Sequence, residues 1–260
     1  MDMSPKEIPI GYYQPGAKLA QMVVKIKDVV GSVADVNRIT ASLNVDIRQS
    51  LSYSVPDESH AVYSAFVEFK DKEVSPEELT RSLRRSKFVL GAEVAEGSDG
   101  LLIDTLEFPI NWGGRRMILL DQRAMGRMLE KIQTMFGSGG ESILYEQGLA
   151  YGKGFMAAAF ERVQKDYVMR IYEYCLSVLA ATGWGRPQVL SSTDLRDFVI
   201  QLERCSECEG RTSARPTSNF IRGFISALFA ALTEKEVDCV EVECVAKGDP
   251  HCKFQLHVTG

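Results

Sequence analysis

Two cysteines flank a strong turn sequence near the end of the chain. Cys244 closes one extended run of residues, and Cys252 opens the next run, at 254–258. Between them lies Gly-Asp-Pro at 248–250, which is typical of a tight turn. A tight turn folds the chain back on itself, so we expect the two thiols to converge in an antiparallel strand pair. Convergent thiols are common metal ligands, and this segment therefore predicts a metal site.

A second pair of thiols lies upstream, at Cys205 and Cys208. Its two-residue gap lets both sulfur atoms reach one tetrahedral ion. Together with Cys244 and Cys252 it predicts a closed four-sulfur zinc site, in which Glu241 is a competing oxygen ligand. The alternative is that the cysteines are ordinary reduced thiols, which are often buried without a ligand. A thioredoxin-type redox motif is disfavoured, because the pair follows an alternating strand and precedes a loop instead of joining a strand to a helix.

Length and composition favour two soluble globular domains. The 260 residues exceed a typical single-core domain, and the 45% apolar content can fill more than one core. No stretch approaches the roughly 20 apolar residues that span a bilayer, and residues 1–15 lack the order of a signal peptide. We therefore expect a cytoplasmic protein, in which the six cysteines are ligands or free thiols instead of disulfides.

The charge of the chain argues against direct nucleic-acid binding. The net charge is -5 and the pI is about 5.4, so a dedicated basic surface is not expected. One basic run, at 81–87, lies beside Glu77 and Glu78 at helical spacing. That arrangement indicates a solvated helix face.

After an N-terminal segment at 1–16, the chain alternates in the order strand, helix, strand, strand, helix, strand. We expect strands at 18–26, 45–55, 61–69 and 89–94, and helices that begin at Ser32 and Pro76. Ser32 is expected to cap the first helix. The second helix has proline in its first position and acidic residues in its first turn, which favours a helix start.

That order, with an Asp-x-x-Gly break after the first strand, resembles the ACT domain over residues 17–95. ACT domains are ferredoxin-like modules that usually bind amino acids or other small effectors at subunit contacts. The resemblance implies that an amino-acid-like effector binds at four consecutive residues, where the amides of a helix N-terminus suit a carboxylate. These residues are Asp28, Val29, Val30 and Gly31. The alternative is that the glycine only permits the turn and that the sheet serves for dimerisation.

A small, polar linker at 96–100 is expected to separate this module from an α+β domain at 101–260. We expect its helices at 125–136, 145–160, 166–181 and after Pro216, and its strands at 187–192, 197–204, 240–244 and 252–258. Gly148 and Gly152 are spaced for close contact with another helix. The pattern predicts helices packed on a small antiparallel sheet.

Several motifs carry a family resemblance. They are Asn-Trp-Gly-Gly-Arg-Arg at 111–116, Gly-Trp-Gly at 183–185, Phe-Ile-Arg-Gly-Phe at 220–224 and, above all, Glu-Val-Glu-Cys-Val-Ala-Lys-Gly-Asp-Pro-His-Cys-Lys-Phe at 241–254. Over residues 103–258 the chain resembles the 4-vinyl reductase domain. The resemblance implies a domain that binds a small hydrophobic molecule, usually as a homodimer, beside a structural zinc ion.

Related domains form the sensory half of bacterial regulators that respond to phenols and other aromatics, and they are distant cousins of vesicle-tethering transport-particle subunits. In the aromatic sensors, a glutamate and three cysteines hold the zinc. Cys244 and Cys252 match two of these thiols, and Glu241 matches the glutamate. The third cysteine falls on Ser218. Either the upstream thiol pair completes the site, or the metal has been lost and the serine is only a helix cap.

The leading hypothesis is a small-molecule-sensing regulatory protein that acts through an unidentified protein partner, because no output motif is visible in the chain. One alternative is an enzyme related to tetrapyrrole vinyl reductases. No dinucleotide or flavin motif supports it, and a fully sulfur-ligated zinc lacks the open position that catalysis requires. The other alternative is a tethering or scaffold protein related to transport-particle subunits.

Overall fold

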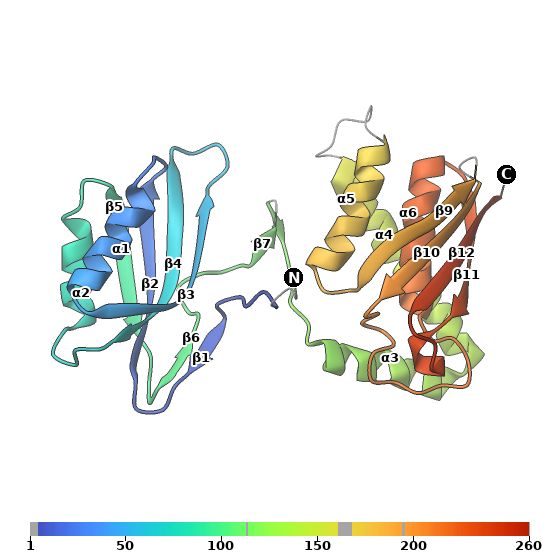
Figure 1. Cartoon of the computed structure of the whole chain (residues 1–260), viewed down its shortest axis with the longest axis horizontal. Coiled ribbons are helices and arrows are strands. Elements are labelled where there is room, and N and C mark those ends of the chain that lie inside the picture. Colours follow the sequence, from blue (N-terminus) through green and yellow to red (C-terminus); the bar gives the residue numbers. More distant parts are fainter. Residues whose placement is uncertain (1–4, 113, 161–167, 194–195, 260) are drawn as a thin grey trace. The chain divides into compact units, whose positions relative to one another are not determined.

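The fold is of the α+β class, as the sequence predicted. It was analysed in a computed structural model, which describes residues 5–112, 114–160, 168–193 and 196–259. The chain forms two compact units, Met1–Ile118 and Leu119–Gly260, each with its own antiparallel sheet and helices (Figure 1).

The first unit contains a four-stranded sheet with ferredoxin-like topology. Its elements are β2 (Lys18–Lys27), α1 (Ser32–Ser42), β3 (Val45–Ser54), β4 (His60–Phe69), α2 (Pro76–Arg84) and β5 (Val89–Glu96). The strand order is β3-β4-β2-β5, and every neighbouring pair is antiparallel. The two central strands therefore bury both faces, which explains why β4 is apolar almost without interruption.

The start of α1 differs from the expectation. Gly31, not Ser32, occupies the N-cap position, with φ of 92° in the left-handed region that glycine adopts at little cost. Ser32 is the first helical residue, and its buried hydroxyl has no hydrogen-bond partner among the described residues. In α2 the expected start is present, because the Ser75 hydroxyl accepts a hydrogen bond from the Glu78 amide at 3.2 Å.

A short strand pair packs on part of the sheet face opposite the helices. It consists of β1 (Gly11–Tyr13) and β6 (Leu101–Ile103), which pair antiparallel. Leu102 packs with Leu19 and Phe66 in a small apolar cluster separate from the helix-side core. Residues expected to form a linker therefore lie inside the first unit, where the Gln14 amide donates to the Gly100 carbonyl at 2.8 Å.

A fully buried glutamine fixes the segment that follows this strand pair. Gln21, on β2, donates to the Asp104 carboxylate at 2.5 Å and accepts hydrogen bonds from the amides of Thr105 and Leu106 at 2.9 and 3.2 Å. A buried amide without such partners would destabilise the fold, so these contacts specify how the segment docks. The unit ends with the short strands β7 (Asn111–Trp112) and β8 (Arg115–Arg116).

The second unit packs helices on one face of a second four-stranded sheet. Its elements are α3 (Gln122–Phe136), α4 (Ser138–Phe160), α5 (Val168–Ala181), β9 (Arg186–Thr193), β10 (Asp197–Glu203), α6 (Asn219–Thr233), β11 (Glu236–Glu243), a short 3₁₀ helix (Val245–Lys247) and β12 (Cys252–Thr259). The strand order is β11-β12-β10-β9, and every neighbouring pair is antiparallel. None of the helices in the described parts of the chain has the length and apolarity needed to cross a bilayer.

The contact between α4 and α6 depends on glycine. A Cβ atom at Gly148 would lie 2.0 Å from the Phe220 carbonyl oxygen, and one at Gly223 would lie 2.0 Å from the Tyr145 carbonyl oxygen. At Gly152 a Cβ would meet Ala227 at 2.6 Å. The two backbones thus touch directly, as the glycine spacing in α4 predicted.

The helix contact gives a test with a matched control. We expect Gly223→Ala to lower the free energy of unfolding by about 1–3 kcal/mol or more, because the added methyl group must push two backbones apart. Gly154→Ala, in α4 where a Cβ would meet open space, should leave stability unchanged or raise it slightly. Urea unfolding of both variants checks this. Equal midpoints for the two would contradict the close approach.

A charge cluster lies on β3 and β4 of the first unit. Glu68 is 8% exposed and accepts hydrogen bonds from Arg48 and, at 2.8 Å, from Lys70. The Lys70 and Arg48 donors hold the pKa of the Glu68 carboxyl below its usual value of 4.5. Since this pKa is depressed in the folded state, the carboxylate stabilises the fold above pH 4.5, and its contribution is lost as the pH falls through the folded pKa.

We therefore expect Glu68→Gln to lower the free energy of unfolding at neutral pH by about 1–3 kcal/mol, because Arg48 loses its carboxylate partner. The difference from the wild type should shrink as the pH falls below about 4.5. The matched control is Glu93→Gln, on the exposed part of β5, which should change little. Thermal unfolding between about pH 3 and pH 7 measures both. A difference that persists unchanged at acid pH would contradict the assignment.

Candidate metal centre

Four separate segments of the second unit bring sulfur and carboxylate groups together. Cys205 and Cys208 lie in the loop after β10, Glu241 lies near the end of β11, and Cys244 and Cys252 lie on the two sides of the turn before β12. All five residues are at most 7% exposed. The two thiol pairs that the sequence predicted to converge therefore do so.

Four of these residues are arranged as a metal site would require. The donor atoms of Cys208, Glu241, Cys244 and Cys252 all lie within 4.8 Å of one another. The sulfur atoms of Cys208 and Cys244 are 3.5 Å apart, close to the roughly 3.8 Å expected between two thiolates on a tetrahedral zinc with bonds of about 2.3 Å. The set can hold a metal ion. Cys205 is not part of that group.

Ser218, where the resemblance placed a third cysteine, lies in the middle of the cluster. Its Oγ atom is 2.8 Å from the sulfur of Cys208 and 3.6 Å from those of Cys205 and Cys252. The same hydroxyl donates to Glu241 Oε1 at 2.7 Å, and the Ser218 amide donates to Oε2 at 2.9 Å. The serine thus orients the carboxylate, while Cys208 supplies a thiol from the upstream loop.

The strand pattern explains why a glutamate is buried here. Along β11 the buried residues Val237, Cys239 and Glu241 alternate with exposed neighbours, so the carboxylate points to the helix side of the sheet. Burial there raises the pKa of Glu241 above its usual value. A register shift between Glu241 and Glu243 marks the place where the strand leaves its regular pairing and continues into Cys244.

A second buried carboxylate caps α6 and was missed by the sequence analysis. Glu207 accepts hydrogen bonds from the amides of Phe220 and Ile221 at 3.2 and 3.0 Å. Ser218 occupies the N-cap position, but its side chain makes no capping bond. Burial raises the pKa of Glu207 to about 8. An acidic residue between the cysteines of a Cys-x-x-Cys pair was the available signal, but its helix partner is remote in sequence.

The thiols share their protons unequally. Neighbouring thiols, first that of Cys205, donate to the sulfur of Cys208 and lower its pKa, which makes it the first of the group to ionise. The proximity of that sulfur raises the pKa of Cys244 to about 11 and that of Cys205 well above its usual value. Crowding of this kind opposes a second negative charge. A bound cation would remove the opposition, because it favours the ionised form of every donor around it.

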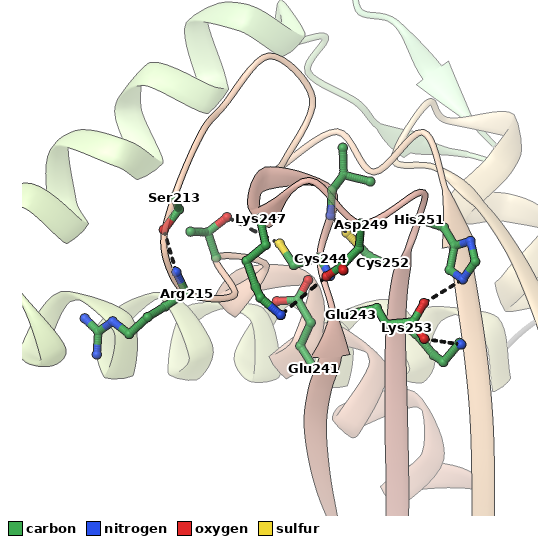
Figure 2. A network of polar contacts seen from close by, with 12 residues as sticks. Ser213, Arg215, Glu241, Glu243, Cys244, Lys247, Asp249, His251, Cys252 and Lys253 are labelled. Carbon is green, nitrogen blue, oxygen red and sulfur yellow. Dashed lines mark hydrogen bonds and ion pairs between the residues drawn. The ribbon is translucent and has the colours of Figure 1, made fainter.

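The turn that carries two of the thiols is fixed by its own polar contacts (Figure 2). The Asp249 carboxylate accepts a hydrogen bond from the Cys244 amide at 2.7 Å and lies 3.4 Å from Lys247 Nζ. Glu243 pairs with Lys253 across the strands and with His251 at 2.9 Å. These contacts hold the turn whether or not a metal is bound.

The loop that carries the other two thiols is fastened to α3. Gln122 Nε2 donates to the Ser206 carbonyl at 2.6 Å, and Gln133 Nε2 donates to the Thr217 carbonyl at 3.2 Å. Arg211 also donates to the Gln133 side-chain oxygen. The loop backbone is therefore anchored near both of its ends by one helix.

A cluster of aromatic rings lies where α4 and α6 meet the Gly-Trp-Gly motif. Trp184 stacks on Phe220 with ring centroids 5.2 Å apart. Tyr151, 45% exposed, lies 5.8 Å from Phe220 and from Phe224 and 6.1 Å from Trp184, while Phe155 meets Phe224 at 5.6 Å. This half-open group is the largest set of ring contacts among the described residues.

The residues expected to bind an amino-acid-like effector lie in the first unit. They form the loop before α1, where Val29 is 54% exposed and Val30 is fully exposed. Gly31 takes the left-handed backbone at the helix start, and Asp28 donates its amide to the Ser59 carbonyl. Effector binding by these residues stays a prediction.

Comparison with known proteins adds to this picture. Residues 198–258 match the model of the vinyl-4-reductase domain family, so the resemblance stated from the sequence is confirmed over that segment. An uncharacterized protein of Methanocaldococcus jannaschii is 26% identical over 131 residues. The match covers 50% of this chain and 62% of that protein, so the chain spans less than two thirds of this relative.

Two solved structures resemble the second half of the chain. The phenol-responsive sensory domain of the transcription activator PoxR is 20% identical with a TM-score of 0.51, covering 56% of this chain and 79% of that one. A vinyl-4-reductase family protein from Methanocaldococcus jannaschii is 18% identical with a TM-score of 0.41, covering 55% and 85%. At these identities the first similarity indicates a shared fold.

Proposed function

We propose that the chain is a small-molecule-responsive regulatory protein whose second unit is braced by a zinc ion. The observation that carries the proposal is the convergence of Cys208, Glu241, Cys244 and Cys252, all buried, with donor atoms within 4.8 Å. Three thiolates and one carboxylate suit zinc better than calcium or magnesium, which take oxygen ligands. When bound, the ion would supply cross-linking and charge neutralisation, as closed zinc sites do.

The aromatic cluster is the proposed contact surface for the ligand. Flat rings roughly 5–6 Å apart offer stacking and edge contacts to an apolar, preferably aromatic, molecule, and the half-exposed Tyr151 lies at its margin. Phe220 and Phe224 lie on α6, whose N-terminus adjoins the thiol cluster. The similarity to a domain that is itself phenol-responsive supports an aromatic ligand. A ligand that favours one arrangement of α6 would shift the population of states that a partner recognises.

The two alternatives have less support. A vinyl-reductase-type enzyme needs a hydride donor, and the proposed four-ligand shell leaves no open metal position for catalysis. A scaffold role would be expressed through partner binding alone. Homodimerisation, a protein partner for the output and effector binding at 28–31 belong to the proposal as expectations that the contacts described above neither require nor oppose.

Metal content provides the first test. We expect wild-type protein, purified without chelator, to contain about one zinc per chain by elemental mass spectrometry and to lose thermal stability when a strong chelator is added. Cys208→Ser and Glu241→Gln should each lower the metal content, because each removes a proposed ligand. The matched control is Cys239→Ala, a buried thiol on the same strand as Glu241 but outside the four-donor group.

The control should keep the wild-type metal content, although it loses some stability with its buried sulfur. Recovery of wild-type protein far below one metal per chain, with a melting temperature that does not respond to chelator, would end the zinc proposal. A normal metal content in Cys208→Ser would instead show that another donor, Cys205 or Ser218, completes the shell.

Ligand binding provides the second test. In a thermal-shift screen with phenols, other aromatic compounds and isoprenoids, we expect at least one compound to stabilise the chain, by about 2.7 kcal/mol at roughly a hundred times its Kd. Trp184→Leu should abolish that shift, because it removes the stacked ring. Trp112→Leu, which alters the other tryptophan of the chain in the first unit, should retain it. No stabilisation by any compound would count heavily against sensing.

A further inference from the structure

We propose that Cys205 and Cys208 form a redox modification site, in which peroxide joins the two sulfur atoms as a disulfide. The pair is buried in the loop after β10, beside the four-donor group but with only one member in it. The disulfide itself does not depend on the proposed function. Its expected consequence, release of zinc, rests on that function, because Cys208 is one of the proposed ligands.

The backbone between the two cysteines already has the geometry of a disulfide-bonded turn. The Cys208 amide donates to the Cys205 carbonyl at 3.1 Å, as in a β-turn. Such a turn places its first and fourth Cα atoms less than about 7 Å apart. Disulfides join Cα atoms about 4.4–6.8 Å apart, so this pair can be bridged with little backbone movement.

The two thiols differ in the roles they can take. Cys208 lies among sulfur and hydroxyl donors that stabilise its thiolate, and the thiolate is the form that attacks an oxidant. Cys205 is buried next to it, 3.6 Å from the Ser218 hydroxyl, yet is surplus to the four donors that fill a tetrahedral shell. A thiol that no metal claims is free to act as the resolving partner.

The chemistry balances with hydrogen peroxide as the oxidant. The Cys208 thiolate attacks one peroxide oxygen, the O–O bond breaks, and the products are a Cys208 sulfenic acid and hydroxide. The Cys205 sulfur then attacks the sulfenic sulfur, forming the S–S bond and expelling the sulfenic oxygen. With the thiol proton and the proton taken up by hydroxide, two thiols and one peroxide give one disulfide and two waters.

Access to the sulfurs requires the loop to open, because Cys205 is 1% exposed and Cys208 is fully buried. The exposed residues Glu209 and Gly210 follow directly, so a short displacement reaches solvent. The loop is anchored to α3 at the Thr217 carbonyl by Gln133. Gln133→Ala removes that anchor, and we expect it to speed disulfide formation.

The test uses the full chain, reduced and loaded with zinc, and treated with hydrogen peroxide. We expect the mass to fall by two hydrogens, peptide mapping to find a Cys205–Cys208 bridge, and a chelating dye to detect the released zinc. Dithiothreitol with added zinc should restore the starting state. The variant Cys205→Ser should bind zinc normally when reduced, lack the bridge, and fail to recover after peroxide, because an unresolved sulfenic acid oxidises further.

Cys239→Ala is the control, and it should respond like the wild type. A bridge that instead joins Cys208 to Cys244, or a Cys205→Ser variant that recovers fully after peroxide, would overturn the proposal. So would loss of zinc from reduced Cys205→Ser, which would make that thiol a metal ligand. If the wild type holds no zinc, the zinc proposal fails, while peptide mapping of the peroxide-treated chain still decides whether the Cys205–Cys208 bridge forms.

Discussion

The second unit depends on burying several acidic donors at the N-terminus of one helix. Glu207 accepts two amides of the first turn of α6, and Glu241 accepts the amide and hydroxyl of Ser218 directly before it. Unpaired carboxylates at this depth would be strongly unfavourable, and the helix amides offset part of that cost. A divalent cation among the adjoining thiols would offset more. The helix start, the strand end and the thiol loop are therefore stable only as a group.

The parts of this site that local sequence could predict are those fixed by local geometry. The turn at 248–250 placed Cys244 beside Cys252, and the two-residue gap indicated that Cys205 and Cys208 act together. Local sequence could not show that Ser218 would lie at the centre of the cluster and leave a thiol position to Cys208. Such an exchange joins residues from separate loops, and only the packed chain reveals it.

The first unit shows the same limit. Its strands and helices follow from alternation and helix-start residues, and the order of the four strands agrees with the predicted ferredoxin-like module. The expected linker at 96–100 instead leads into β6, which packs against the sheet. Its polar, glycine-rich composition is typical of both a linker and a turn. The contacts of Gln21 with the segment after β6 decide the matter, and they join residues 83 and 84 positions apart in the sequence.

The direct backbone contact between α4 and α6 restricts how any signal can travel. Helices separated by long side chains can slide, since rotamer changes absorb small shifts, but Gly148 and Gly223 leave no side chain to adjust. The two helices must therefore tilt as one lever. Because α6 begins at the thiol cluster and also carries Phe220 of the aromatic cluster, an event at either place is transmitted to α4 without attenuation by intervening side chains.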